Sequence, residues 1–220
     1  NIRSIPSMVD GQKPSTRKVL FSAFKRNLKN EIKVAQLAGY TSEHAAYHHG
    51  EVSLEGTIKG MGQNYIGSNN YNLLIGVGQF GTRLQGGSDA AQSRYIFSKL
   101  NPTTRKLFNE HDDVLCNYLD DDGQSIEPEY YYPILPVIAM NGSQGIGTGY
   151  STKIPMHNPL DICKYVKNKI EGLETKPIIP WYRGFRGKIE PTSKGSFITR
   201  GTYTILEKSD RKSTRLNSSH

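Results

Sequence analysis

The sequence is organised around Gly78-Gln79-Phe80-Gly81-Thr82-Arg83 and, a short way on, Ser93-Arg94-Tyr95-Ile96-Phe97. Between the two stretches lies Gly86-Gly87-Ser88-Asp89, a run of turn-forming residues. A free tyrosine is a poor nucleophile at neutral pH because its pKa is about 10. The adjacent guanidinium of Arg94 favours the phenolate of Tyr95, and its fork can hold two oxygens of a phosphodiester. The pair therefore indicates attack on a phosphodiester; the alternative is a tyrosine packed at the edge of an element.

The composition favours a polyanionic partner. The 220 residues include 28 Lys and Arg against 20 Asp and Glu, a formal net charge of +8. Such a balance is typical of proteins that bind nucleic acid or anionic membranes. The longest apolar run, 134–140, is interrupted by Pro136 and is too short to span a bilayer, and no signal segment opens the chain. The two cysteines, Cys116 and Cys163, are too few for a disulfide framework or a zinc ribbon, which fits a reducing compartment.

Five motifs in order make a stronger signal than the Arg-Tyr pair alone. They are Ile5-Pro6-Ser7-Met8-Val9-Asp10-Gly11 with Lys13-Pro14, Ala46-Tyr47-His48-His49-Gly50-Glu51, Gln79-Phe80-Gly81-Thr82-Arg83, Arg94-Tyr95-Ile96-Phe97, and Asn141-Gly142 through Gly145-Ile146-Gly147-Thr148-Gly149. Together they resemble the DNA breakage-reunion region of type IIA DNA topoisomerases of eukaryotes and large DNA viruses. The resemblance runs from the first residue to about Leu206, and the sequence reads as a fragment of such an enzyme.

The resemblance implies a fold, a reaction and a set of site residues. The fold is mixed α/β, with a winged-helix DNA-cleavage domain over 1–135 and the start of a tower domain over 136–209. The reaction is ATP-dependent passage of one duplex through another, by way of a transient 5′-phosphotyrosyl break. Tyr95 is the implied nucleophile, and Arg94 steadies the charge on the phosphate. The implied DNA-binding residues are Arg17, Lys18, Lys33, Gln36, His48, His49, Arg83 and Ile146.

The resemblance also implies partners and cofactors. The complete enzyme is expected to bind double-stranded DNA as a homodimer in the nucleus, or in the host cell or virion if it is viral. It would need Mg²⁺ and ATP, whose sites lie in Toprim and ATPase regions outside this sequence. Two rivals stay open: a non-catalytic helix-turn-helix DNA-binding module, and an unrelated tyrosine recombinase. The several further catalytic cations that a recombinase needs form no visible pattern here.

The first part of the chain predicts helices. Pro14 can open a helix in which Val19, Leu20, Ala23 and Phe24 recur at helical spacing. Arg17 and Lys18 then lie either on a phosphate-contacting face or on a solvated one. Residues 33–38, a turn at Gly39 and a second helix over 41–47 predict a helix-turn-helix. The glycines within 55–62 predict that the helix there is weak.

Three sequence patterns resemble metal-binding or nucleotide-binding sites, and we reject each interpretation. His44, His48 and His49 lack a further Cys or carboxylate to complete a metal site. The acids of 120–122 precede Gly123, which favours a turn with solvated carboxylates. The run 76–81 spells a dinucleotide fingerprint, but no crossover helix or correctly spaced acid follows it, and no Walker A pattern is present. We expect these glycines to let the backbone turn and approach DNA or a second subunit.

The second half predicts mixed structure. Residues 99–108 and 159–173 are expected to be helical, and strand-like alternation follows over 181–206. Ile146, between two glycines, is implied by the resemblance to wedge between base pairs; the alternative is an ordinary core residue. Residues 210–220 depart from the family and match an in-frame translation of a sequencing-library adapter, so no ordered contacts are expected there. Leaving this segment out keeps the chain basic.

Overall fold

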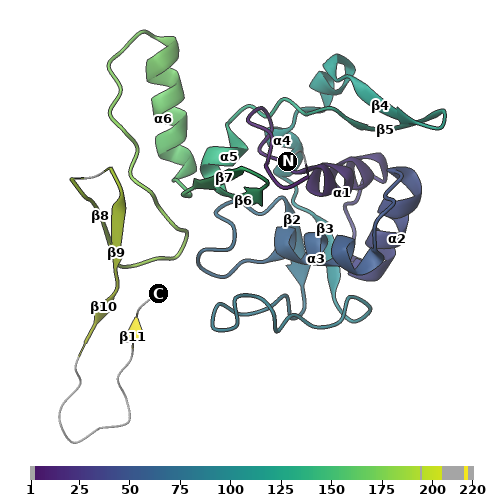
Figure 1. The fold of residues 1–220 in the computed structure, drawn as a ribbon, viewed down its shortest axis with the longest axis horizontal. Coiled ribbons are helices and arrows are strands. Elements are labelled where there is room, and N and C mark those ends of the chain that lie inside the picture. Colours follow the sequence, from purple (N-terminus) through teal and green to yellow (C-terminus); the bar gives the residue numbers. More distant parts are fainter. Residues whose placement is uncertain (1–2, 194, 205–215, 218–220) are drawn as a thin grey trace, which may run out of the picture.

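The computed structural model describes residues 3–193, 195–204 and 216–217 as a mixed α/β fold (Figure 1). Three helices form its first part: α1 (Pro14–Lys25), α2 (Val34–His44) and α3 (Glu51–Gly62). They pack beside an antiparallel sheet of order β1-β3-β2, formed by β1 (Ile32–Lys33), β2 (Leu74–Val77) and β3 (Phe97–Leu100). Proline opens α1 as expected, because its missing N–H is not needed in the first turn.

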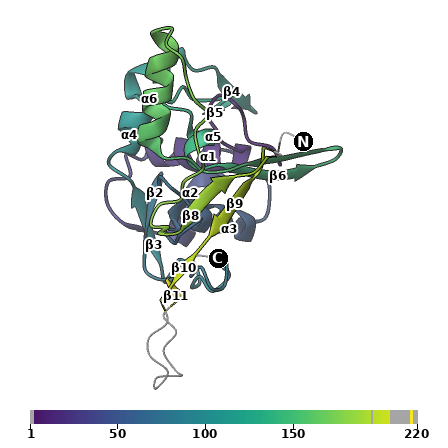
Figure 2. The ribbon, with the colours of Figure 1, turned by 90° about the vertical axis from the view of Figure 1, so that its left-hand side faces the viewer.

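The rest of the described chain consists of short elements and two-stranded hairpins. These are α4 (Thr104–Leu107), the 3₁₀ helix η1 (Glu110–Leu115), β4 (Tyr118–Asp121), β5 (Gln124–Pro128), α5 (Val137–Met140), β6 (Ser143–Gly147), β7 (Tyr150–Ile154), α6 (Pro159–Ile170), β8 (Lys188–Pro191), β9 (Phe197–Arg200), β10 (Thr202–Tyr203) and β11 (Leu216–Asn217). In Figure 1, α6 and the β8–β9 hairpin stand to one side of the helical part. Figure 2 shows the β6–β7 hairpin projecting from the body. None of the described helices combines the length and apolar character required to cross a membrane.

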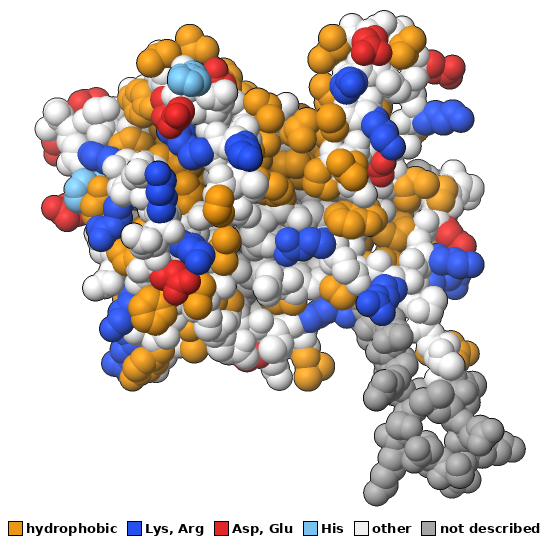
Figure 3. Space-filling model, turned by 180° about the vertical axis from the view of Figure 1, so that it is seen from behind, with side chains coloured by type: hydrophobic (Ala, Val, Ile, Leu, Met, Phe, Trp, Pro, Cys, Tyr) orange, Lys and Arg blue, Asp and Glu red, His pale blue; other side chains and the backbone are white. Residues whose placement is uncertain are grey.

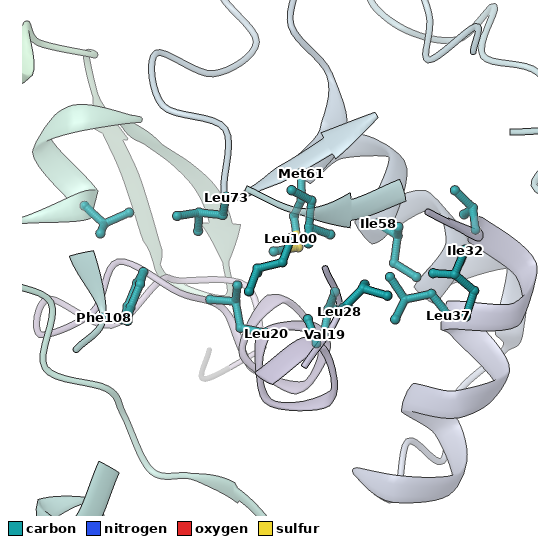
Figure 4. Close-up of a cluster of buried hydrophobic side chains, with 14 of the residues drawn as sticks. Val19, Leu20, Leu28, Ile32, Leu37, Ile58, Met61, Leu73, Leu100 and Phe108 are labelled. Carbon is teal, nitrogen blue, oxygen red and sulfur yellow. The ribbon is translucent and has the colours of Figure 1, made fainter. Parts of the chain in front are cut away.

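One hydrophobic core joins the helices to the sheet (Figure 4). Val19 and Leu20 of α1 face Leu37 of α2 and Ile58 of α3, and all four side chains are fully buried. Burial of such side chains is the main favourable term in folding. The core does not stop at residue 135, where the sequence suggested a boundary. Val137, Met140 and Ile162 belong to the same buried cluster, so packing is continuous into the second half.

The predicted turn at Gly39 is wrong, because α2 runs unbroken from Val34 to His44. The buried positions Val34, Leu37, Ala38 and Thr41 keep helical spacing across the glycine. Gly39 itself faces solvent, where a missing side chain leaves no cavity. The break comes later, after Ala45, and the helix that follows α2 is α3. The glycines of α3 do not interrupt it, since Leu54, Ile58 and Met61 anchor one face in the core.

The prediction of a helix over residues 99–108 is also wrong at the start of that range. Lys99 and Leu100 belong to β3, which pairs with β2 across Ile75 and Leu74. Pairing with β2 overrides a local helical pattern. The helix that remains, α4, has a single turn. By contrast the turn expected at Gly123 is confirmed: Asp122 and Gly123 both have positive φ, at 50° and 83°, as a two-residue hairpin between β4 and β5 requires.

The C-terminal half follows the predicted pattern of one helix and then strands. The helix α6 begins after Asn158, whose side chain caps it by accepting a hydrogen bond from the Leu160 amide. The strands β8 and β9 pair in antiparallel register, and the end of the strand expected over 202–206 lies outside the described residues. The tail prediction is wrong at one point, because β11 pairs with β10. An open strand edge on β10 provides the backbone groups for that pairing; the other residues of 210–220 lie outside the described part.

Candidate nucleic-acid interface

The loop after β2 is anchored by one buried aromatic ring. Phe80 is 5% exposed, and its ring lies against Gly62 of α3 and Gly76 of β2. A Cβ added at either glycine would approach the ring to 2.7 Å, closer than real side chains allow. Gly76 therefore makes room for Phe80, and the fingerprint-like glycines serve packing and turning. The predicted tight turn is confirmed at Gly78 and Gly81, whose φ angles are 105° and 102°, and the predicted approach to DNA or a second subunit stays a prediction.

The tip of this loop is held by its own hydrogen bonds. Gly81 and Gly87 have φ of 102° and 84°, and a Cβ on Gly81 would lie 2.5 Å from the Gly87 Cα. Asp89 accepts from the Thr82 amide at 2.7 Å and from its hydroxyl at 2.8 Å. Both bonds lower the pKa of Asp89 below its ordinary value, and the bond from the Thr82 amide has the larger effect. Arg83 is half-exposed within this closed loop.

Tyr95 lies in an exposed turn directly before β3. Its side chain is 66% exposed, while its neighbours Ser93 and Ile96 are buried and fix the turn on both sides. The Tyr95 amide donates to the Gln92 carbonyl at 2.9 Å. The Arg94 guanidinium carbon lies 5.0 Å from the centre of the Tyr95 ring, within cation–π range. The phenol and the cation are therefore presented together on the surface.

The start of α2 lies against the Tyr95 turn. The Val34 amide donates to the Ile96 carbonyl at 3.0 Å and the Ala35 amide to the Ser93 carbonyl at 3.2 Å. Lys33 pairs with Phe97 in the sheet, and both Lys33 and Gln36 expose their side chains. Two of the predicted DNA-binding residues are thus brought close to Tyr95 by backbone contacts.

His48 and His49 lie beyond the opposite end of α2. A helix of this length separates its ends by about 15 Å, so the fold does not bring these imidazoles to Tyr95 of the same chain. His48 Nε2 lies 2.8 Å from the Asp121 carboxylate at the end of β4. His49 packs edge-on against Tyr47 and is exposed. The neighbouring Gln124 amide donates to the Glu43 and His44 carbonyls, which holds the β4–β5 turn on the end of α2.

Arg17 and Lys18 require a correction. The sequence suggested phosphate contacts, but Arg17 is buried; its Nε and Nη2 donate to the two Asp10 carboxylate oxygens at 2.7 Å and 3.0 Å, and Nη2 also donates to the Gln12 carbonyl. Lys18 donates to Glu127 at 2.9 Å and to the Ala45 carbonyl. Buried charges need such partners because desolvation is costly. Both cations are therefore occupied in joining α1 to its surroundings.

Ile146 is carried by the projecting β6–β7 hairpin. It is 79% exposed and pairs with Ser151 in the hairpin register, so it is not a core residue. Gly145 lies so close to the N-terminal segment that an added Cβ would meet the Ser4 carbonyl at 2.3 Å. Lys13 donates to the Gln144 carbonyl at 3.2 Å on the same strand. The base of the hairpin is thus fixed while Ile146 points into solvent.

The described residues contain no cluster of three or more His, Cys, Asp or Glu side chains that could hold a metal ion. His44 Nδ1 lies 3.0 Å from the Tyr40 carbonyl oxygen, whereas His48 Nε2 lies 2.8 Å from the Asp121 carboxylate, so the two imidazoles have different partners. The donor set required for Mg²⁺, with converging oxygen ligands, is thus not assembled by these residues. Figure 3 shows Lys and Arg side chains scattered over one face of the molecule, among hydrophobic and acidic side chains.

The sequence reading missed the residues that support the site. Asp10 orders Arg17 and also accepts from the Gln12 and Tyr131 amides; Asp121 lies beside His48. Asn70 and Asn72 are buried polar residues, and Asn141 bonds to Tyr71. The three asparagines within residues 69–72 could have signalled Asn70 and Asn72, because neighbouring side-chain amides offer both donors and acceptors for specific polar contacts; no such run marks Asn141.

Comparison with known proteins decides the family. A family model for the DNA gyrase/topoisomerase IV A subunit matches residues 3–217. The chain belongs to this family. It is 54% identical over 207 residues to the mitochondrial DNA topoisomerase 2 of Dictyostelium discoideum, which covers 94% of this chain and 16% of that protein. It is 53% identical over 206 residues to DNA topoisomerase 2 of Drosophila melanogaster, covering 94% and 14%.

A solved structure shows the same fold. The Plasmodium falciparum topoisomerase II DNA-binding, cleavage and re-ligation domain superposes with a TM-score of 0.91 and 52% identity, covering 94% of this chain and 28% of that one. The chain therefore spans a small part of the length of these relatives. The matches fit the predicted topoisomerase II region and not the non-catalytic helix-turn-helix alternative.

Proposed function

We propose that this chain is the DNA breakage-reunion part of a type IIA DNA topoisomerase and that Tyr95 is its nucleophile. The observation that carries the proposal is the exposed Tyr95–Arg94 pair on a buried scaffold, within a chain whose relatives are named DNA topoisomerase 2. The complete enzyme would pass one duplex through a double-strand break in another, with ATP hydrolysis. It changes DNA topology, and is thus an isomerase.

The chemical step is a transesterification at phosphorus. The Tyr95 phenolic oxygen attacks the scissile phosphate and loses its proton, while the bond from phosphorus to the 3′ oxygen breaks. The 3′ oxygen takes up a proton, and the 5′ end stays on Tyr95 as a phosphotyrosine. Arg94 lies close enough to share the charge on the phosphate oxygens. Religation is the same step reversed, so no external energy is needed to close the break.

The DNA would lie across residues from three places. Lys33 and Gln36 lie near the Tyr95 turn and Arg83 lies in the loop that precedes this turn, His48 and His49 lie beyond the other end of α2, and Ile146 is carried on the β6–β7 hairpin. Exposed cations and imidazoles suit phosphate contact, and an exposed isoleucine suits insertion between base pairs. We assign α1–α3 with the three-stranded sheet to a winged-helix domain. The hairpin, α6 and the strands after it form the start of a tower.

The proposal extends to the rest of the enzyme. Mg²⁺ and ATP would serve the complete enzyme at sites outside this chain, as the family resemblance implies. Magnesium, when bound, stabilises the leaving oxygen. The partner molecules are double-stranded DNA and a second copy of the enzyme, in the nucleus, or in the virion or host cell for a viral protein.

A trapping experiment tests the proposal. The complete enzyme is incubated with labelled duplex and Mg²⁺, quenched with detergent and run on a denaturing gel. The wild type is expected to yield protein-linked 5′ ends, whereas Tyr95→Phe, which keeps the ring and removes the attacking oxygen, yields none. Tyr203→Phe, at another exposed tyrosine, is the matched control and should cleave normally. Linked ends from the Tyr95→Phe enzyme would refute the assignment.

A further inference from the structure

Three asparagines form a polar junction between the Tyr95 half of the chain and the Ile146 half. We call Asn70, Asn72 and Asn141 the asparagine junction. Asn70 and Asn72 are 5% and 7% exposed, unusually low for polar side chains. Asn70 and Asn141 bond to backbone groups of distant segments, up to 113 residues away. Asn72 donates to the nearer Met61 and Gln63 carbonyls and accepts from the Arg183 side chain. Because a side-chain amide is both donor and acceptor, it can replace a peptide group in such contacts.

Asn141 makes a reciprocal pair with the backbone of Tyr71. Its Oδ1 accepts from the Tyr71 amide at 2.8 Å, and its Nδ2 donates to the Tyr71 carbonyl at 2.8 Å. The geometry imitates one rung of a β-ladder, with a side chain in place of a second strand. Asn141 stands directly before Gly142 and the strand β6 that carries Ile146. The base of the hairpin is thereby fixed to the segment before β2.

Asn70 and Asn72 fix the same segment to the chain beyond the hairpin. Asn70 Nδ2 donates to the carbonyls of His157, at 3.1 Å, and Trp181, at 2.8 Å, and its Oδ1 accepts from the Arg183 amide at 2.9 Å. Every hydrogen-bonding position of that amide group except one lone pair is used. Asn72 accepts from Arg183 Nη2 at 2.7 Å. The segments after β7 and after α6 therefore meet at this point.

A short rigid path leads from the junction to Tyr95. Residue 72 is followed by Leu73 and then β2, whose Leu74 to Val77 pair with Leu100 to Phe97 of β3. Tyr95 lies just before β3, and the buried Ile96 between them is fixed. Paired strands and a buried core transmit position with little compliance. The junction is thus the place where the element that carries the nucleophile meets the element that carries the wedge.

We propose that the asparagine junction sets the position of the Ile146 hairpin relative to Tyr95 and so couples DNA bending to DNA cleavage. Asn141 is its main positioning residue, since it acts through the hairpin and not on the DNA. The inference rests on the proposed function and deepens it. An aspartate at 141 would keep the shape but replace the Nδ2 donor with an acceptor facing the Tyr71 carbonyl, which loses one hydrogen bond and adds repulsion.

The test compares three forms of the complete enzyme: wild type, Asn141→Asp, and Asn117→Asp as the matched change at an exposed asparagine outside the junction. Bending is measured by energy transfer across a doubly labelled duplex, cleavage by the detergent-quenched gel, and folding by thermal unfolding. Each enzyme is also given a duplex already kinked by unpaired bases at the bend, because such a duplex costs little to deform.

We expect Asn141→Asp to bind DNA about as tightly as the wild type, while bending and cleavage of the intact duplex both fall about tenfold. The kinked duplex should restore its cleavage, which a general loss of folding would not allow. Normal bending and cleavage by Asn141→Asp, or a loss that the kinked duplex does not restore, would overturn the inference and leave the proposed function standing. A wild-type enzyme that forms no covalent complex would overturn both.

Discussion

At the scale of single residues, the same side-chain type serves opposite purposes. Arg94 is exposed beside Tyr95, whereas Arg17 is buried against Asp10, 2.7 Å away. The sequence alone could not separate these roles, because the resemblance implied contact with the DNA phosphates for both arginines. Burial decides between the roles. The Arg17 guanidinium is buried against a carboxylate and is not accessible to DNA. The Arg94 guanidinium lies over an exposed phenol and is accessible to DNA.

Arg17→Ala should therefore act on stability. Removing one partner leaves the Asp10 carboxylate buried without its cation, which typically costs about 3–5 kcal/mol. Chemical denaturation of this chain measures the change, with Arg186→Ala, at an exposed arginine, as the control. If Arg17→Ala were as stable as the control and bound DNA more weakly, the phosphate-contact role that we rejected would be restored.

Arg94→Ala should act on chemistry. The variant keeps the nucleophile but removes the nearest preorganised cation, and loss of one such group typically costs about a hundredfold in rate. Single-turnover cleavage by the complete enzyme measures this. Thermal unfolding should be unchanged because Arg94 is exposed. Cleavage at the wild-type rate would show that charge stabilisation comes from elsewhere.

At the scale of elements, the Gly78–Asp89 loop carries its own pH dependence. The hydrogen bonds from Thr82 lower the pKa of Asp89 in the folded chain. Their contribution to the stability of the loop is therefore fully present above the ordinary aspartate pKa of about 3.9, and it is lost as the pH falls through the lowered pKa. We expect the amide signal of Thr82 to shift over that acidic range in the wild type and not in Asp89→Asn. Asp161→Asn is the control, and it should retain the transition.

The β6–β7 hairpin should control DNA shape. Ile146→Ala is expected to reduce bending, measured by energy transfer in the complete enzyme, more than it reduces affinity, because unstacking needs a bulky wedge. Ile170→Ala removes an equally exposed isoleucine, 80% against 79%, from α6 and should leave bending unchanged. Equal bending by both variants would mean that Ile146 is no wedge.

Elements with a clear local signal were predictable and those set by distant contacts were not. Pro14 marked the start of α1, and the 159–173 periodicity gave α6. Lys99 joins β3 because β2 lies beside it, and α2 runs through Gly39 because its buried face continues. The exposed positions of Tyr95 and Ile146 agree with the sequence reading, while Asp10 and Asn141 act through partners remote in sequence.

At the scale of the whole molecule, the net charge of +8 should govern DNA affinity. Cations that contact phosphates release counterions, so binding by this chain should weaken steeply with salt. Lys33→Ala is expected to lower the slope of log affinity against log salt by about 1, and Lys164→Ala, on α6, to leave it unchanged. Fluorescence anisotropy over a salt series measures both. Affinity indifferent to salt would contradict a phosphate-based interface.

The central claim concerns one of 13 tyrosines, and peptide mapping decides it most directly. The complete enzyme is trapped on duplex DNA with Mg²⁺, the DNA is digested to a nucleotide stub, and the tryptic peptides are sequenced by mass spectrometry. We predict that the stub is joined through its 5′ phosphate to Tyr95, in the peptide that follows Arg94. A stub on any other residue, or one joined through a 3′ phosphate, would contradict the account.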